Sequence, residues 1–149
     1  MVRGESNAQM EKRLPVYLMP AEENDFLTVR SIKRQLDGAL GAHGAWLLEP
    51  YVDLPSTSGL VLETVEDIEE TARLAVKYGY QVNTHAIGDR ANRETLDLYQ
   101  RVFTSAQNSM QEPSANTTQH SVQDLRWRVE HAQHIDPLDV PRFGELGVI

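Results

Sequence analysis

The sequence contains no cysteine, which excludes disulfide bonds and thiolate metal ligands. Any bound metal ion would therefore be held by His, Asp, Glu or a modified Lys side chain. No run of about 18 apolar residues is present, so we expect no membrane-spanning helix. The polar N-terminus also lacks the apolar core of a signal peptide. A chain without cysteine is also compatible with a reducing compartment. Together these features predict a cytoplasmic protein.

Positive charge is scarce as well. Lys and Arg number 14 against 22 Asp and Glu, which gives a formal net charge of −8. Nucleic acids and anionic membranes require a basic surface, so neither is an expected partner. The apolar fraction of 40% and the charged fraction of 24% are those of an ordinary globular protein. With 149 residues the chain is one domain or less, and a complete eight-stranded α/β barrel usually needs about 250.

The first third of the chain is the least regular part. We interpret residues 1–26 as a polar tail followed by a possible first strand at residues 14–19. A strand is predicted from residue 27 to residue 36. Glycines at 38, 41 and 44 then predict a loop in which the backbone turns tightly or approaches a ligand closely. Residues 49–60, with two prolines, predict a long surface loop.

The middle of the chain alternates helix and strand. A helix is predicted to begin after Thr64 as N-cap and to end at Gly79. The apolar segment 80–84 follows as a buried strand that ends just before His85. A second helix is predicted to start near residue 89 or 90, and its end merges into a polar insert at residues 105–121.

The last part repeats this pattern. Residues 125–130 predict a strand, and Asp136 followed by proline predicts the start of a helix that ends at Gly147. Val148 and Ile149 read as the start of another strand. The β-α-β-α-β-α order predicts an α/β fold with a parallel sheet, for which an open doubly wound sheet and a piece of a barrel both fit. The stop at Ile149 favours an incomplete piece.

Two histidines follow buried strands of this predicted sheet. His85 comes directly after residues 80–84, and His131 follows residues 125–130. In a barrel of parallel strands, residues at the carboxyl ends of strands point into one pocket. Imidazole is a common ligand of zinc and similar divalent metals. We therefore expect the two histidines to share one metal site.

Five motifs follow one another along the chain: Lys33-x-x-x-Asp37-Gly-Ala-Leu-Gly, Leu47-Leu-Glu-Pro-Tyr, His85-Ala-Ile-Gly-Asp-Arg-Ala-Asn, Arg128-Val-Glu-His131-Ala-Gln and Arg142-Phe-x-x-Leu-Gly-Val-Ile. In this order they resemble amidohydrolase family three, and within it the branch of N-substituted formamide deformylases. The resemblance covers residues 27–149, which we treat as a partial barrel domain. It implies a segment of a (β/α)8 TIM barrel, about strands 3 or 4 to 6, from a hydrolase that cleaves carbon–nitrogen bonds other than peptide bonds.

The resemblance also implies a metal site with a divalent ion, for which we expect zinc. His85 and His131 match the metal-binding histidines of strands five and six in that family. Lys33 matches a strand-four lysine that is carboxylated in some members. The expected substrate is a small-molecule amide or formamide-like compound. The sequence does not indicate the number of metal ions or the oligomeric state.

The sequence departs from the family pattern at two places. The family has a His-x-His pair on strand one and an Asp on strand eight; this sequence has no His-x-His and no strand eight. Because these residues supply metal ligands and the usual general base, we expect the segment to have no catalytic residue of its own and to be inactive alone. A metal-binding remnant that has lost catalysis, or a truncated product without independent function, is the alternative.

Several charged residues adjoin the predicted site. We expect Asp37 to hydrogen-bond the glycine-rich loop rather than to bind metal. Asp89 and Arg90 either orient His85 through a hydrogen bond or cap the following helix. Glu130 lies beside His131 in the sequence, and the same two roles, orienting the histidine or capping, are open to it. All four are candidates for supporting the metal ligands or contacting the substrate.

Overall fold

The computed structural model describes residues 1–20, 26–110 and 122–149, and these form one parallel sheet with helices packed on it. In chain order the elements are β1 (Val2–Arg3), α1 (Asn7–Tyr17), β2 (Ser31–Gln35), the 3-10 turn η1 (Leu40–Ala42), α2 (Val65–Tyr78), β3 (Gln81–Ala86), α3 (Asp89–Met110), the 3-10 turn η2 (Val122–Leu125), β4 (Arg128–His131) and α4 (Val140–Leu146). The strands pair in the order β1-β2-β3-β4, and every pairing is parallel. The predicted α/β class is confirmed.

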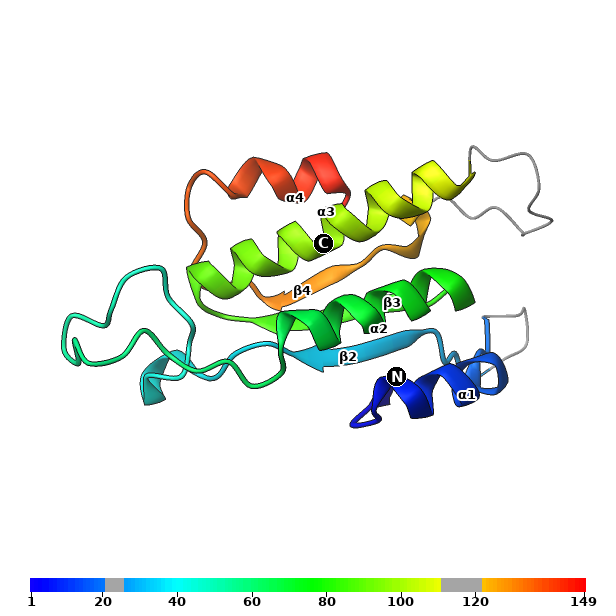
Figure 1. Ribbon diagram of the computed structural model, residues 1–149, viewed down its shortest axis with the longest axis horizontal. Coiled ribbons are helices and arrows are strands. Elements are labelled where there is room, and N and C mark those ends of the chain that lie inside the picture. The colour runs from blue at the N-terminus through cyan, green and yellow to red at the C-terminus, as the bar shows by residue number, and fades with distance from the viewer. Residues whose placement is uncertain (21–25, 111–121) are drawn as a thin grey trace.

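All four α-helices lie on one side of the sheet (Figure 1). They pack in chain order, α1 against α2, α2 against α3 and α3 against α4. Each parallel connection therefore crosses the same face of the sheet, as in a barrel, and not alternate faces as in a doubly wound sheet. Within the described part of the chain, no helix is long and apolar enough to cross a membrane.

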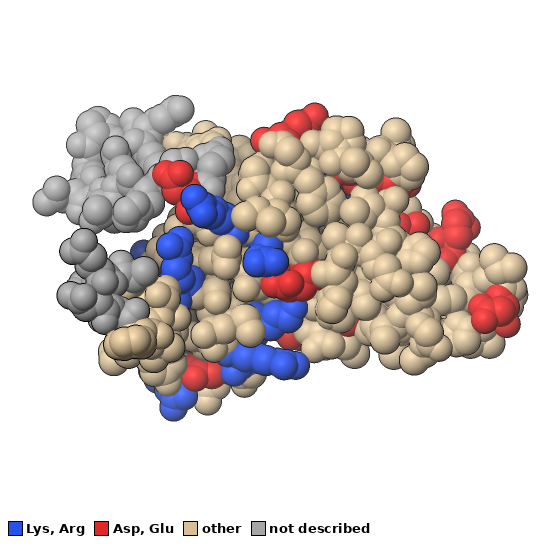
Figure 2. Space-filling view, turned by 180° about the vertical axis from the view of Figure 1, so that it is seen from behind, with Lys and Arg blue, Asp and Glu red and all other residues tan. Residues whose placement is uncertain are grey.

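The two faces of the sheet differ in chemistry. Ile32, Val82 and Val129, one from each of three strands, are buried in the hydrophobic core beneath the helices. Because side chains alternate along a strand, Lys33 and Glu130 lie on the opposite face. Figure 2 shows Lys and Arg side chains, with some Asp and Glu among them, gathered on this side, which faces away from the described helices. The open face is thus polar, as expected of a surface that lines a barrel.

The helix α2 matches its predicted bounds because its end signals are local. The Thr64 side chain accepts a hydrogen bond from the Asp67 backbone N–H at 3.2 Å. Gly79 ends the helix in the left-handed conformation, with φ of 76°, which glycine adopts without steric cost. Tyr80 then leads directly into β3.

The predicted strand at residues 14–19 is wrong. Ser6 and Gln9 form a reciprocal capping box, and α1 runs from there to Tyr17 with Pro15 inside it. Met10 and Leu14, four residues apart, are the buried positions of this helix. The N-terminal tail expected before it is also partly ordered, because Val2–Arg3 pairs with β2.

Other boundaries differ by a few residues. The strand β3 extends through His85 to Ala86, α3 continues past Ser105 to Met110, and β4 begins only at Arg128. The remainder of the predicted polar insert, residues 111–121, lies outside the described residues.

The last helix also begins later than predicted, at Val140 and not after Asp136. Asp136 instead forms a turn, in which its side chain accepts from the Leu138 backbone N–H at 2.9 Å. Beyond α4, the Ile149 backbone N–H donates to Trp127 at 3.0 Å, and its carbonyl accepts from Val129 at 2.9 Å. The end of the chain thus lies beside β4, as expected for the start of a further strand.

Gly88, between β3 and α3, sits against backbone from the loop after β2. A Cβ atom at Gly88 would lie 1.9 Å from the Trp46 carbonyl oxygen. We expect Gly88→Ala to lower the free energy of unfolding by about 3 kcal/mol, because backbone must move to admit the methyl group. The matched control is Gly41→Ala, where nothing lies within 4 Å and the change should stay within about 0.5 kcal/mol. Chemical denaturation of both variants measures this, and equal stabilities would contradict the close packing.

Candidate functional site

The side chains of His85 and His131 meet at the carboxyl ends of two neighbouring strands. The strand register places Ala86 opposite His131. The two imidazole rings lie edge to face, with centroids 4.6 Å apart and an angle of 73° between their planes. The structure therefore brings together the two histidines that the sequence singled out.

His85 has an unsatisfied ring nitrogen. Its side chain is only 12% exposed, and Nε2 is buried with no hydrogen-bond partner among the described residues. The Oδ1 atom of Asp37 is 3.4 Å from that nitrogen but does not form a hydrogen bond with it. Burial lowers the pKa of His85, and the negative charge of Asp37 only partly opposes this effect. The lowered pKa favours the neutral ring, which is the form that binds a metal ion.

His131 is held by an unusual backbone. It has φ of 80°, and Ala132 follows with φ of 43°. Positive φ is uncommon for residues other than glycine. The Ala132 N–H donates to the Ala86 carbonyl at 3.1 Å, which ties this segment to the end of β3. The His131 side chain itself is exposed and open to a ligand.

Lys33 shares the open face of the sheet with His85. It pairs with Asn83 in the register between β2 and β3. Partial burial lowers the pKa of its ammonium group, and the nearby Glu130 opposes this shift. Glu130 forms an ion pair with Arg128 at 3.2 Å. Lys33 is thus a half-buried amine near both histidine-bearing strands.

Asp37 is fully buried and joins the ends of β2 and β3. Its Oδ2 accepts from the backbone N–H groups of Trp46 and Gly88, both at 2.9 Å. Its Oδ1 accepts from the Ile87 N–H at 3.0 Å. Three donated hydrogen bonds stabilise the buried charge. Asp37 therefore fixes the glycine-rich loop against the turn that follows His85.

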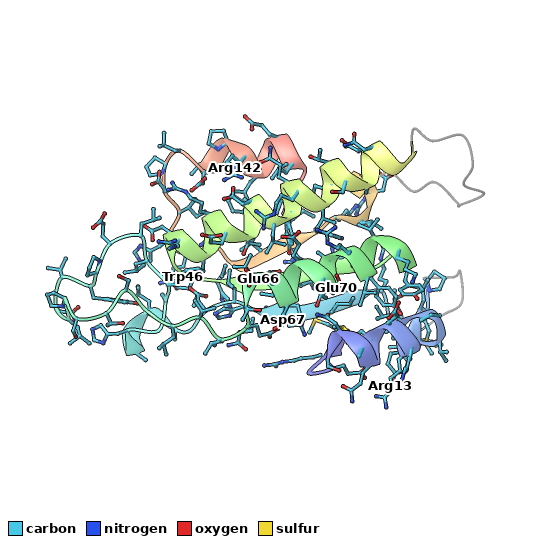
Figure 3. All side chains as sticks on the ribbon, viewed as in Figure 1. Arg13, Trp46, Glu66, Asp67, Glu70 and Arg142 are labelled. Carbon is cyan, nitrogen blue, oxygen red and sulfur yellow. The ribbon has the colours of Figure 1, made fainter. Side chains whose placement is uncertain are left out.

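Asp89 and Arg90 contact the loop after β2 and the start of α3 rather than His85. The Asp89 Oδ1 atom accepts from the Leu48 N–H at 2.8 Å and from the Arg90 N–H at 2.9 Å. The Arg90 guanidinium lies over the Trp46 ring, 5.1 Å from its centroid, where Trp46 sits beside the start of α3 (Figure 3). Neither side chain hydrogen-bonds His85 in the structure.

Sequence reasoning missed Asn92, whose buried side chain contacts the segments after both β3 and β4. Its presence in the motif that begins at His85 was the available signal. Across residues 1–20, 26–110 and 122–149, no group of three or more His, Cys, Asp and Glu residues is placed to hold a metal ion. The donors that the described chain brings together are thus two imidazoles with the Lys33 amine nearby.

The role of Asp37 can be tested by Asp37→Asn. The amide retains one oxygen acceptor and places N–H donors against backbone N–H donors, so we expect a loss of about 3 kcal/mol in unfolding free energy. The control is Asp53→Asn, which alters an exposed carboxylate paired with His43 at 2.9 Å and should leave stability nearly unchanged. Urea denaturation distinguishes the two variants. If Asp37→Asn lowers the free energy of unfolding no more than its control does, the carboxylate does not hold the loops together.

Comparison with known proteins agrees with this architecture. The chain resembles two solved structures, uncharacterized metal-dependent hydrolases from Pyrococcus furiosus and Pyrococcus horikoshii OT3. Each superposes with a TM-score of 0.72, at 29% and 27% identity, over 96% and 95% of this chain. The chain covers only 26% and 25% of those structures. Its sheet and helices are a segment of a (β/α)8 barrel, as the sequence predicted.

Two curated proteins are also similar. Protein LONG AFTER FAR-RED 3 of Arabidopsis thaliana is 34% identical over 126 residues, which is 85% of this chain and 19% of that protein. Putative amidohydrolase YtcJ of Bacillus subtilis (strain 168) is 42% identical over 65 residues, which is 44% of this chain and 12% of that protein. The chain thus spans less than a fifth of each relative. The sequence model of the Amidohydrolase family matches residues 4–149, so the match begins well before residue 27 and the chain belongs to the amidohydrolase family.

Proposed function

We propose that this chain forms part of a metal-dependent hydrolase that cleaves a carbon–nitrogen bond in a small-molecule amide or formamide-like substrate. The observation that carries the proposal is the pair of imidazole rings at the ends of β3 and β4, with centroids 4.6 Å apart. One of them has a buried ring nitrogen for which the described part of the chain offers no hydrogen-bond partner. The family match and the metal-dependent hydrolases among the structural neighbours support it.

The residues present fit part of a zinc site. Zinc takes neutral imidazole, carboxylate and water ligands, and a catalytic site has three protein ligands with one open position. His85 and His131 supply two imidazoles, and Lys33 supplies a third donor if its amine is carboxylated. A divalent metal held there would polarise the amide carbonyl and lower the pKa of a bound water. Further ligands would come from other strands of a complete barrel.

The residues of this chain prepare the donors for that role. Burial keeps the pKa of His85 low, so its ring is available as a ligand at neutral pH. Asp37 places a negative charge 3.4 Å from the same ring and fixes the loops on either side of it. Glu130 offers a carboxylate beside Lys33. Because Asp37 is committed to three backbone N–H groups, we expect the proton of the attacking water to go to a carboxylate elsewhere in the barrel, and the segment to be inactive alone.

Zinc titration of the protein tests the two ligands. We expect His85→Ala and His131→Ala each to weaken zinc binding at least tenfold, measured by isothermal titration calorimetry. His43→Ala is the control, because His43 is a loop histidine paired with Asp53 and should leave the affinity unchanged. Equal affinity in all three variants would remove the metal site from this proposal. Metal binding without amide hydrolysis in a complete barrel would support the non-catalytic alternative.

Carboxylation of Lys33 makes a separate prediction. A neutral lysine nitrogen adds to carbon dioxide and releases a proton, and burial already lowers the pKa of Lys33 and enlarges the neutral fraction. We therefore expect bicarbonate to strengthen zinc binding, more so as pH rises, and Lys33→Met to abolish the effect. The control is Lys77→Met, since hydrogen bonds to Tyr78 and Glu11 raise the Lys77 pKa. If bicarbonate acts equally on the Lys33 variant, Lys33 is not the modified group.

A further inference from the structure

The Asn92 side chain is fully buried in the first turn of α3. Its Nδ2 donates to the Gly88 carbonyl at 2.8 Å and to the His134 carbonyl at 3.0 Å. The carbonyl oxygens of Ala86 and Ile87 lie 3.4 Å from the same nitrogen. Four carbonyl oxygens around one atom identify it as the amide nitrogen, because an amide oxygen there would face only acceptors.

These contacts join the two segments that carry the histidine pair. Gly88 belongs to the turn three residues after His85, and His134 lies three residues after His131. The His134 N–H also donates to the Ile87 carbonyl at 2.9 Å. A single amide therefore links the backbone that leaves β3 to the backbone that leaves β4.

The segment after β4 requires such support. His131 and Ala132 both have positive φ, and left-handed conformations of residues other than glycine persist only where the surroundings over-determine them. The Asn92 bond to His134 is the only side-chain hydrogen bond described for residues 131–135. This bond connects the segment to α3. The backbone hydrogen bonds of Ala132 and His134 connect it to Ala86 and Ile87, where β3 ends.

Packing alone does not explain an amide side chain at this position. The Asn92 Oδ1 atom is buried with no hydrogen-bond partner among the described residues, and an unsatisfied buried acceptor is unfavourable. An apolar side chain of similar size would avoid that cost. The NH2 group is therefore the part of the side chain that forms the hydrogen bonds, and it holds the two turns together.

We propose that Asn92 is a positioning residue that sets the separation of the His85 and His131 rings. The part of this inference that concerns metal affinity rests on the proposed function. The part that concerns ring geometry rests on the contact between the two rings, which lie edge to face. Residues that orient metal ligands typically change metal affinity by about 10–100-fold when they are removed.

The test compares Asn92→Ala with Thr95→Val. Thr95 is equally buried on α3, but its hydroxyl donates to the Ala91 carbonyl of the same helix at 2.8 Å. NMR measures the cross-relaxation between the His85 and His131 ring protons, and calorimetry measures zinc affinity. We expect Asn92→Ala to lose the ring contact and to bind zinc about tenfold more weakly. Thr95→Val should lose stability while it keeps both the ring contact and the affinity.

Folded Asn92→Ala protein that keeps the inter-ring signal overturns the inference, whether or not zinc binds. If the unaltered protein does not bind zinc, that result contradicts only the proposed function. The role of Asn92 is then tested by the contact between the two rings alone.

If Asn92→Ala does not fold, the hydrogen bonds of Asn92 are measured in the unaltered protein instead. Its Asn92 side-chain NH2 protons should exchange slowly and show a scalar coupling across the hydrogen bond to the His134 carbonyl carbon. Rapid exchange without coupling overturns the inference.

Discussion

A buried carboxylate organises the end of the sheet where the site forms. Asp37 has no solvent exposure, and a charge in that position is tolerated only when hydrogen bonds replace its hydration. Backbone N–H groups from two separate loops supply them. Because the donors are main-chain atoms, the carboxylate specifies the path of the backbone and not only the placement of side chains. The same charge lies next to His85, so one residue shapes both the loops and the electrostatic environment of a proposed ligand.

The sheet explains why two of the proposed ligands, Lys33 and His85, lie on its open face. Each strand alternates between a core face and an open face, and the core positions Ile32, Val82 and Val129 fix the register. A slip of one residue would bury Lys33 and His85 beneath the helices and expose the core, which hydrophobic burial strongly disfavours. The apolar pattern of the core thus determines on which face of the sheet the polar groups lie.

Features encoded by near neighbours in the sequence were predictable. The Thr64 cap and the Gly79 stop follow from short motifs. The meeting of His85 with His131 follows from the position of both residues at the carboxyl ends of parallel strands. The helix at Asn7–Tyr17 was not predicted, because Pro15 and the apolar residues around it resemble a strand. The bonds of Asp37 to the turn after β3, and those of Asn92, were also beyond local inference. Their partners lie up to 51 residues away, and only the folded backbone brings them together.

The site is thereby built in two layers with different physical origins. Parallel pairing brings the strand ends together and would do so for many sequences. The finer arrangement depends on polar side chains that bind backbone, Asp37 on one side of β3 and Asn92 between β3 and β4. Both are fully buried, so each is costly unless its bonds form, and that cost makes the arrangement specific. These bonds hold the backbone next to the partly buried His85 and the exposed His131, which has a positive φ. The loops after the strands are therefore part of the proposed site, and changes to their side-chain-to-backbone hydrogen bonds would alter the proposed ligand geometry most directly.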